Sequence, residues 1–193
     1  AIDFYNDLGL SRFKYLKLKL DANSSPEYVQ EIYNIHQKPL MLDANEGFKS
    51  LDEYFYFENS IKNIPIIFVE EPLSKELYLY YPELKHKSIF KLLADESLSG
   101  EINWDFLQKS FHGINMKYQK AGSITRGLEI INKAKQLGFF TMCGCMVEST
   151  LAMEFSWLTA QLTDYADLDG YLIIKNEPFN LLKENNGLIL KKI

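Results

Sequence analysis

One apolar run of the chain, Ile64-Pro65-Ile66-Ile67-Phe68-Val69-Glu70, ends directly in a carboxylate. The chain repeats this arrangement on both sides of that run, with amphipathic stretches in between. The charged residues that end the successive runs, at intervals of 22 to 27 residues, are Lys19, Asp43, Glu70, Asp95 and Lys117. Short apolar runs that alternate with segments of helical length predict parallel strands joined by helical crossovers.

The regular spacing favours a closed barrel over an open, doubly wound sheet. Neither the G-x-G-x-x-G pattern nor the P-loop pattern of open sheets occurs in the sequence. In a (β/α)8 barrel the chemistry lies at the C-terminal ends of the strands, on residues from different strands. We therefore expect an α/β fold of the TIM-barrel type. The strands should lie over the runs 13–20, 39–42, 64–69, 89–94, 113–116, 139–143 and 166–174.

Three intervening segments have the spacing of helices. Residues 123–138 carry an apolar stripe at helical spacing and end at Gly138, which favours a helix stop. Residues 26–33 follow a possible N-cap at Ser25, and residues 150–163 form an apolar segment of helical length.

Composition indicates a folded domain and argues against several partners. The 193 residues are 47% hydrophobic and 24% charged, which is typical of a globular protein. The net charge of −5 gives no support to nucleic-acid binding, and no apolar run reaches the roughly 18 residues of a membrane span. Cys143 and Cys145, separated by one glycine, are expected to be free thiols in a reducing cytoplasm.

Two lysines in the first run are candidate acid–base groups. Lys17 and Lys19 alternate with leucines, so period two places both ammonium groups on one face of a strand. Two ammonium groups side by side repel each other, which favours loss of a proton from one of them and suits a general base. The alternative is an exposed edge strand with a polar face.

Three carboxylates form a candidate metal site. Asp43, Glu70 and Asp95 each follow an apolar run immediately, and three carboxylates that converge from neighbouring strands need a cation. Oxygen ligands of this kind suit Mg²⁺. The three histidines, none of them at a strand end, do not favour zinc and are expected in loops or on the surface.

Further charged residues follow the later runs. Lys117 ends the fifth run, and Lys120 follows it in an expected loop, as a supporting contact or solvated. Asp167 and Asp169 share one face by period two and suit a positively charged substrate group. The alternative for the aspartates is an ordinary turn beside a strand.

Taken in order, these motifs resemble the enolase superfamily, in its muconate-lactonizing subgroup. The matching pieces are Lys17-Leu18-Lys19, Leu42-Asp43-Ala44-Asn45-Glu46-Gly47, Val69-Glu70-Glu71-Pro72, Ala94-Asp95-Glu96-Ser97 and Lys117-Tyr118-Gln119-Lys120-Ala121-Gly122. The pieces Gly144-Cys145-Met146-Val147-Glu148-Ser149 and Asp167-Leu168-Asp169-Gly170 look like the dipeptide epimerases, of the L-Ala-D/L-Glu type. One departure is Gly122-Ser123, where that family usually has two glycines.

The resemblance implies a mechanism. Mg²⁺ on Asp43, Glu70 and Asp95 would bind the substrate carboxylate and stabilise an enediolate. Lys19 and Lys117 would stand on opposite faces of the α-carbon, one removing the proton and the other returning it.

The resemblance also implies supporting roles. Lys17 would tune Lys19, Asn45 would support the metal ligands, and Asp167 and Asp169 would hold the dipeptide's α-ammonium. The expected partner is a small dipeptide, with no nucleic acid or membrane, and the full-length protein is expected to be a homo-oligomer.

The same resemblance implies a division of the polypeptide. Family members carry an N-terminal capping domain and a first barrel strand, so residues 1–193 are expected to be a partial C-terminal barrel domain with strands two to eight. That span alone is expected to be inactive. One alternative is an o-succinylbenzoate synthase or muconate-type cycloisomerase. A second is an inactive truncated remnant.

Overall fold

The computed structural model describes residues 2–20 and 24–192. The chain divides into two compact units. The first comprises Ala1–Leu93 with Asp105–His112, and the second comprises Ala94–Trp104 with Gly113–Ile193. Seven parallel strands within the described residues form a sheet whose strand order, β1 to β7, follows the order of the chain. This sequential parallel order confirms the α/β barrel-type prediction.

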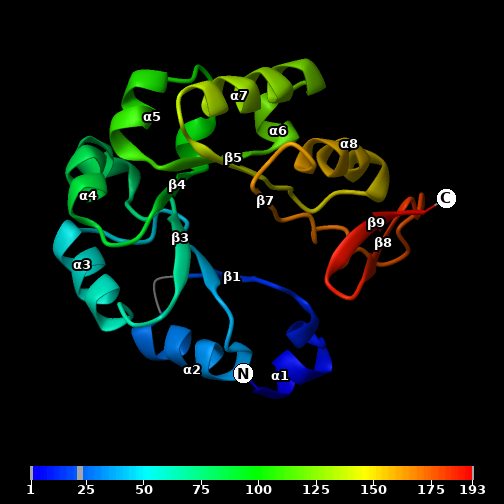
Figure 1. Cartoon of the computed structure of the whole chain (residues 1–193), viewed down its shortest axis with the longest axis horizontal. Helices are drawn as coiled ribbons and strands as arrows, with labels where there is room; N and C mark the ends of the chain where they lie inside the picture. Colours follow the sequence, from blue (N-terminus) through cyan, green and yellow to red (C-terminus); the bar gives the residue numbers. More distant parts are fainter. Residues whose placement is uncertain (1, 21–23, 193) are drawn as a thin grey trace. The chain divides into compact units, whose positions relative to one another are not determined.

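The first unit alternates strands with helices, and Figure 1 shows α2, α3 and α4 on the outer side of its strands. Its elements are α1 (Ile2–Asp7), β1 (Leu16–Lys19), α2 (Pro26–His36), β2 (Leu40–Asp43), α3 (Leu51–Ser60), β3 (Ile66–Glu70), α4 (Tyr81–Lys87), β4 (Leu92–Ala94) and α5 (Trp104–Ser110), with 3-10 turns at Leu10–Arg12 and Lys75–Tyr80. The ends of β4 and α5 extend into the residue ranges of the second unit. All four residues of β2 are buried, as expected for a parallel strand that is covered on both faces.

The second unit continues the same alternation. Its elements are a 3-10 turn (Glu96–Leu98), β5 (Gly113–Met116), α6 (Tyr118–Ala121), α7 (Ile124–Gln136), β6 (Phe140–Cys143), α8 (Thr150–Ala160), β7 (Tyr165–Ala166), β8 (Leu182–Asn185) and β9 (Leu188–Lys191). Helix α7 packs on β5 and β6. It begins after Ser123, whose side chain accepts a hydrogen bond from the Arg126 N–H, and it is followed by Gly138 at φ 82°. The helix expected over 123–138 is thus confirmed.

The register of the strands brings the predicted charged residues to one level. In the first unit Lys19 is the β1 partner of Asp43 on β2, and Asp43 is the partner of Glu70 on β3. In the second unit Met116 pairs with Cys143, and Cys143 pairs with Ala166. Lys117, Gly144 and Asp167 therefore each follow directly after paired strand residues.

The prediction of a strand over 166–174 is wrong for most of its length. Strand β7 contains only Tyr165 and Ala166, residues 167–169 and 174 are irregular, and residues 170–173 form a turn. Within this segment the backbone passes close to the preceding loop, since a Cβ at Gly170 would lie 2.2 Å from the main-chain oxygen of Met146. Asp167 and Asp169 therefore lie in a loop, and their common face cannot be inferred from strand periodicity.

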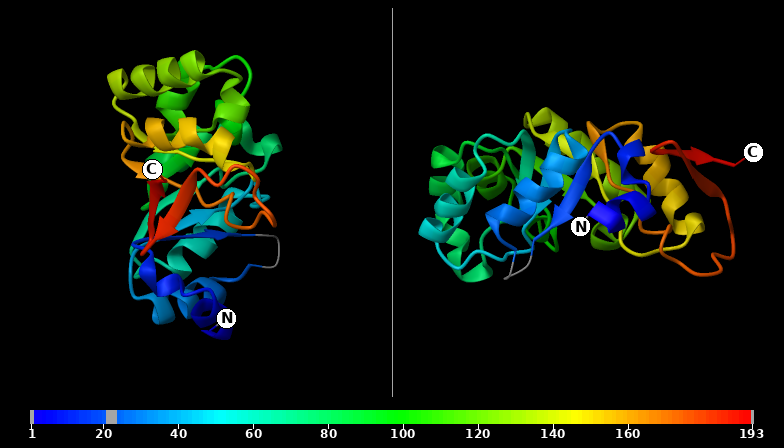
Figure 2. Two further views of the ribbon diagram at one scale, coloured as in Figure 1. Left: turned by 90° about the vertical axis from the view of Figure 1, so that its right-hand side faces the viewer. Right: turned by 90° about the horizontal axis from the view of Figure 1, so that it is seen from below.

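Two further features were not expected from the sequence. An antiparallel hairpin, β8–β9, lies beside α8, as the red and orange segments of Figure 2 show, and Trp157 Nε1 donates to Ile189 O at 2.8 Å. His36, expected in a loop or on the surface, is buried on α2, and its Nδ1 shares a hydrogen bond of 2.9 Å with the Tyr5 hydroxyl. The described part of the chain contains no helix with the length and apolar character that crossing a membrane requires.

Candidate active site

In the first unit one ammonium group joins two buried carboxylates. Lys17 Nζ lies 3.3 Å from Asp43 Oδ2 and 3.3 Å from Glu70 Oε2. The Glu70 side chain is fully buried, and those of Asp43 and Lys17 are 6% and 13% exposed. Alternation along β1 explains the contact, because it turns Lys17 toward the ends of β2 and β3 while Leu18 is buried on the opposite face. Lys19, one alternation further, is exposed.

Asp43 and Glu70 have the chemistry of a cation site. Burying carboxylates is costly unless positive charge compensates them, and here the Lys17 ammonium contacts both. Oxygen ligands from two neighbouring strand ends fit Mg²⁺. Over residues 2–20 and 24–192 no group of three or more His, Cys, Asp or Glu side chains is assembled around one point. Asp95 belongs to the second unit, so the three-carboxylate site stays a prediction.

In the second unit a carboxylate lies between two ammonium groups. Lys117 Nζ is 2.7 Å from Asp95 Oδ2, and Lys120 Nζ is 2.7 Å from Asp95 Oδ1. Burial raises the pKa of Asp95, but the charges and hydrogen bonds of Lys117 and Lys120 outweigh burial and hold that pKa below its ordinary value. Lys120 lies on α6 and not in the expected loop.

The loop after β7 carries negative charge. The Asp167 N–H donates to Cys143 O at 3.0 Å, which places this half-buried residue directly beside the end of β6, and Asp169 is exposed. Burial raises the pKa of the Cys145 thiol to about 12, and the charges of Asp167, Asp169 and Glu148 contribute to that rise. The loop after β7 and Glu148 thus contribute negative charge near this thiol.

Glu148 was not singled out from the sequence as a site residue. Its carboxylate accepts hydrogen bonds from the Gln119 side chain and from the Met146 N–H. Glu148 follows no strand directly, so the strand-end pattern does not reveal it. Only its position within the quoted Gly144–Ser149 motif points to it.

Asn45 contacts the candidate metal site through the main chain. Asn45 Nδ2 donates to the Asp43 carbonyl oxygen at 3.3 Å, and Asn45 itself has a φ of 45°. It therefore supports the end of β2, and its predicted role beside the metal ligands stays a prediction.

Gly144 makes room for the side chain of Lys117. A Cβ at this position would lie 2.5 Å from Asn115 Oδ1 and 3.0 Å from Lys117 Cε. We expect Gly144→Ala to displace the Lys117 side chain and to lower turnover of the complete protein by about 100-fold, because a displacement of about 1 Å is enough for such a loss. Steady-state kinetics measure the loss of turnover, and a thermal melt measures any accompanying loss of stability.

The control for this prediction is Gly113→Ala. Gly113 is the first residue of β5 and pairs with Phe140, the first residue of β6. A Cβ there would lie 2.5 Å from the Phe140 ring, so the steric conflict is similar but involves an aromatic ring on β6 and no atom of Lys117. We expect comparable destabilisation, about 1–3 kcal/mol, with turnover near that of the wild type. Equal losses of turnover in the two variants would contradict the special role of Gly144.

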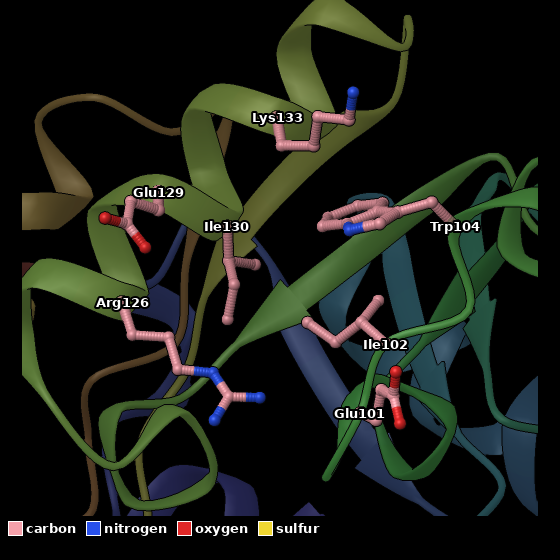
Figure 3. Close-up of a pocket in the computed structure, with 7 residues that line it drawn as sticks. All are labelled: Glu101, Ile102, Trp104, Arg126, Glu129, Ile130 and Lys133. Atoms are coloured by element: carbon pink, nitrogen blue, oxygen red, sulfur yellow. The ribbon is translucent and has the colours of Figure 1, made fainter.

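A groove of about 370 Å³ lies elsewhere in the second unit. Figure 3 shows its lining on α7 and on the segment before α5: Glu101, Ile102, Trp104, Arg126, Glu129, Ile130 and Lys133. None of the predicted catalytic, metal-binding or substrate-binding residues lines it. The groove is therefore separate from the candidate site.

These elements define a barrel-type α/β chain with charged residues at its strand ends, and comparison with known proteins identifies the family. The chain belongs to the enolase C-terminal domain-like family, whose model matches residues 4–178.

Curated relatives are named as epimerases. The L-Ala-D/L-Glu epimerase of Bacteroides thetaiotaomicron is 30% identical over 177 residues, which cover 92% of this chain and 46% of the relative. The L-Ala-D/L-amino acid epimerase of Flavobacterium johnsoniae is 33% identical over 162 residues, covering 83% and 48%. The chain thus spans about half the length of these relatives.

A solved structure agrees with this assignment. An enolase family member from Agrobacterium tumefaciens with homology to dipeptide epimerases, described with bound sodium and L-Ala-L-Glu, has a TM-score of 0.84 and 27% identity. The match covers 93% of this chain and 55% of the Agrobacterium chain.

Proposed function

We propose that this chain is the catalytic part of a Mg²⁺-dependent dipeptide epimerase that inverts the α-carbon of the dipeptide's C-terminal residue. The observation that carries the proposal is the pairing of each buried strand-end carboxylate with a lysine: Lys17, within β1, contacts Asp43 and Glu70, and Lys117, directly after β5, contacts Asp95. The epimerase names of the relatives support it.

Asp43, Glu70 and Asp95 are proposed to hold the cation. When bound, Mg²⁺ would neutralise the substrate carboxylate and the charge that develops on it as the α-proton leaves. The shared contact of Asp43 and Glu70 with one ammonium supports the proposal for these two residues. The sodium described for the Agrobacterium relative also supports a cation site.

Lys19 and Lys117 are proposed to move the α-proton. Each stands at the carboxyl end of its strand, and each is next to a proposed metal ligand: Lys19 by register with Asp43, and Lys117 by its ion pair with Asp95. Lys17 keeps its ammonium on the carboxylates, which leaves Lys19 as the exposed lysine of the pair. One lysine would take the proton and the other would return it.

Asp167 and Asp169 are proposed to bind the α-ammonium of the dipeptide. The negative charge around Cys145 supports this role. An o-succinylbenzoate synthase or a cycloisomerase has no need of an ammonium-binding pair, so the two aspartates favour the epimerase.

The complete protein is proposed to be a cytoplasmic homo-oligomer with an N-terminal capping domain. The relatives support the additional domain, because each is about twice as long as the region that matches this chain. The test of the activity is direct: the complete protein is incubated with Mg²⁺ and L-Ala-L-Glu, and formation of L-Ala-D-Glu is followed by NMR. Conversion of an o-succinylbenzoate precursor without epimerisation would favour the alternative enzyme, and inactivity on both would favour the inactive remnant.

Removal of the two aspartate charges is expected to change substrate preference. Asp167→Asn combined with Asp169→Asn should lower kcat/KM for a free-amino dipeptide 10- to 100-fold more than for its N-acetylated form, because about 1.5–3 kcal/mol of charged hydrogen bonding is lost. Parallel kinetics on the two substrates provide the measurement. Asp105→Asn, an exposed change on α5, is the control, and equal losses on both substrates would contradict the assignment.

A further inference from the structure

Lys120 repeats the orientation of Lys117 one helical turn later. Lys117 is the N-cap of α6, and the Lys120 N–H donates to the Lys117 carbonyl oxygen at 3.0 Å. This first turn brings side chains three residues apart to the same side of the helix. The two ammonium groups therefore reach the same carboxylate.

The two oxygens of Asp95 have different partners. Oδ2 lies 2.7 Å from Lys117 Nζ, and Oδ1 lies 2.7 Å from Lys120 Nζ. The Asp95 side chain is only 4% exposed, so water has little access to it. Rotation of the Asp95 carboxylate about its terminal bond would lengthen at least one of these ion pairs, so the Lys120 contact favours the orientation in which Oδ2 points at Lys117.

Lys120 is itself held from the other side. Its Nζ lies 3.5 Å from Glu96 Oε1, and its side chain is 21% exposed. Glu96 thereby offsets part of the second positive charge beside Asp95. An exposed lysine–carboxylate pair contributes about 0–1 kcal/mol. The Asp95 side chain is buried, and without Lys120 it would retain Lys117 as its ammonium partner.

We propose that Lys120 is a positioning residue that orients the Asp95 carboxylate toward Lys117 and the cation, with Glu96 as its anchor. This inference rests on the proposed function, which assigns Lys117 as a base and Asp95 as a metal ligand. Lys120 would touch neither the substrate nor the cation.

The test compares four variants of the complete protein. Lys120→Met keeps a long side chain but removes the charge, Lys120→Arg keeps the charge, and Glu96→Gln removes the anchor. Lys87→Met is the matched control, because Lys87 and Glu83 form a pair of the same 2.7 Å length that is largely exposed on α4. Mg²⁺ affinity is measured by calorimetry without substrate, and kcat and KM are measured at saturating Mg²⁺.

The two possible roles of Lys120, orienting Asp95 or only repelling the cation, predict opposite changes in Mg²⁺ affinity when its charge is removed. If Lys120 orients Asp95, Lys120→Met should weaken Mg²⁺ binding and lower kcat, each by about 10- to 100-fold, as for other residues that support metal ligands. Lys120→Arg should recover most of both losses, Glu96→Gln should show a smaller loss, and Lys87→Met should match the wild type. If Lys120 only repels the cation, Lys120→Met would strengthen Mg²⁺ binding, and stronger or unchanged binding would overturn the proposal.

The outcomes also separate this proposal from the proposed function. A complete protein that binds Mg²⁺ but epimerises no dipeptide would overturn the function, while the calorimetry would still decide the role of Lys120. An active wild type with a fully active Lys120→Met variant would overturn only the positioning role. If Lys120→Met does not fold, the Glu96→Gln and Lys120→Arg variants test the positioning role. Wild-type Mg²⁺ affinity in Glu96→Gln together with weaker Mg²⁺ binding in Lys120→Arg would overturn that role. A wild type without Mg²⁺ binding would overturn both.

Discussion

Replacement of either Lys19 or Lys117 by alanine in the complete protein is expected to lower epimerisation by on the order of 10²–10⁴-fold. Inversion requires a proton to leave one face of the α-carbon and to return on the other, so loss of either ammonium interrupts the cycle. Each lysine stands at a strand end beside a proposed metal ligand, Lys19 by register with Asp43 and Lys117 at 2.7 Å from Asp95. Steady-state rates with each diastereomer measure the loss.

The two alanine variants should differ from each other in α-proton exchange. Each should still exchange the α-proton of one diastereomer with solvent, because one base survives, and the retained diastereomer should be opposite in the two variants. Lys62→Ala, which removes an exposed lysine bonded to Asn59, is the control and should behave as the wild type. Normal turnover in either catalytic-lysine variant would contradict the two-base scheme.

Replacement of Glu70 by glutamine is expected to abolish cation binding and to lower activity by on the order of 10³-fold, which corresponds to several kcal/mol of lost charge stabilisation. The Glu70 side chain is fully buried and shares the Lys17 ammonium with Asp43. A neutral amide would leave Lys17 with a single carboxylate and the cation with one ligand fewer. Calorimetry with Mg²⁺ and a rate measurement provide the two readouts.

The control for Glu70→Gln is a second buried carboxylate of the same unit. Glu58 on α3 accepts hydrogen bonds from the Tyr54 and Ser88 hydroxyls and takes no part in the proposed site. Glu58→Gln should lower thermal stability and leave Mg²⁺ affinity unchanged. If Glu70→Gln behaved in the same way, the role of Glu70 would be structural.

The strand ends were predictable because two simple patterns coincide there. An apolar run signals a buried strand, and a charge directly after it has to lie where the strand leaves the core. Parallel pairing, with one register shift between Leu40 and Leu42 on β2, then sets Lys19, Asp43 and Glu70 at one level. The sequence predicted this arrangement without knowledge of any side-chain contact.

Loop positions could not be predicted in the same way. The run over 166–174 is apolar enough for a strand, but β7 ends at Ala166 and the chain then passes close to Met146 at Gly170. Period two therefore does not govern Asp167 and Asp169. Glu148 gives no periodic signal, because its contacts with Gln119 and Met146 depend on how two loops meet.

Tertiary contacts also determine the environment of residues for which local sequence patterns make no clear prediction. No pattern in the sequence distinguishes a solvated Lys120 from a supporting one, whereas its contacts with Asp95 and Glu96 do. His36 was expected in a loop or on the surface, yet packing of α1 against α2 buries it beside Tyr5. Such pairings join residues that are distant in sequence and leave no periodic trace.

Solvent-deuterium incorporation tests the central claim most directly. The complete protein is incubated in D₂O with Mg²⁺ and L-Ala-L-Glu, and the α-proton of the glutamate residue is followed by NMR. We predict that this signal disappears from both diastereomers as they interconvert, while the α-proton of the alanine residue remains, and that removal of Mg²⁺ by a chelator stops the exchange. Retention of the glutamate α-proton, or exchange that persists in a variant lacking both Lys19 and Lys117, would contradict the account.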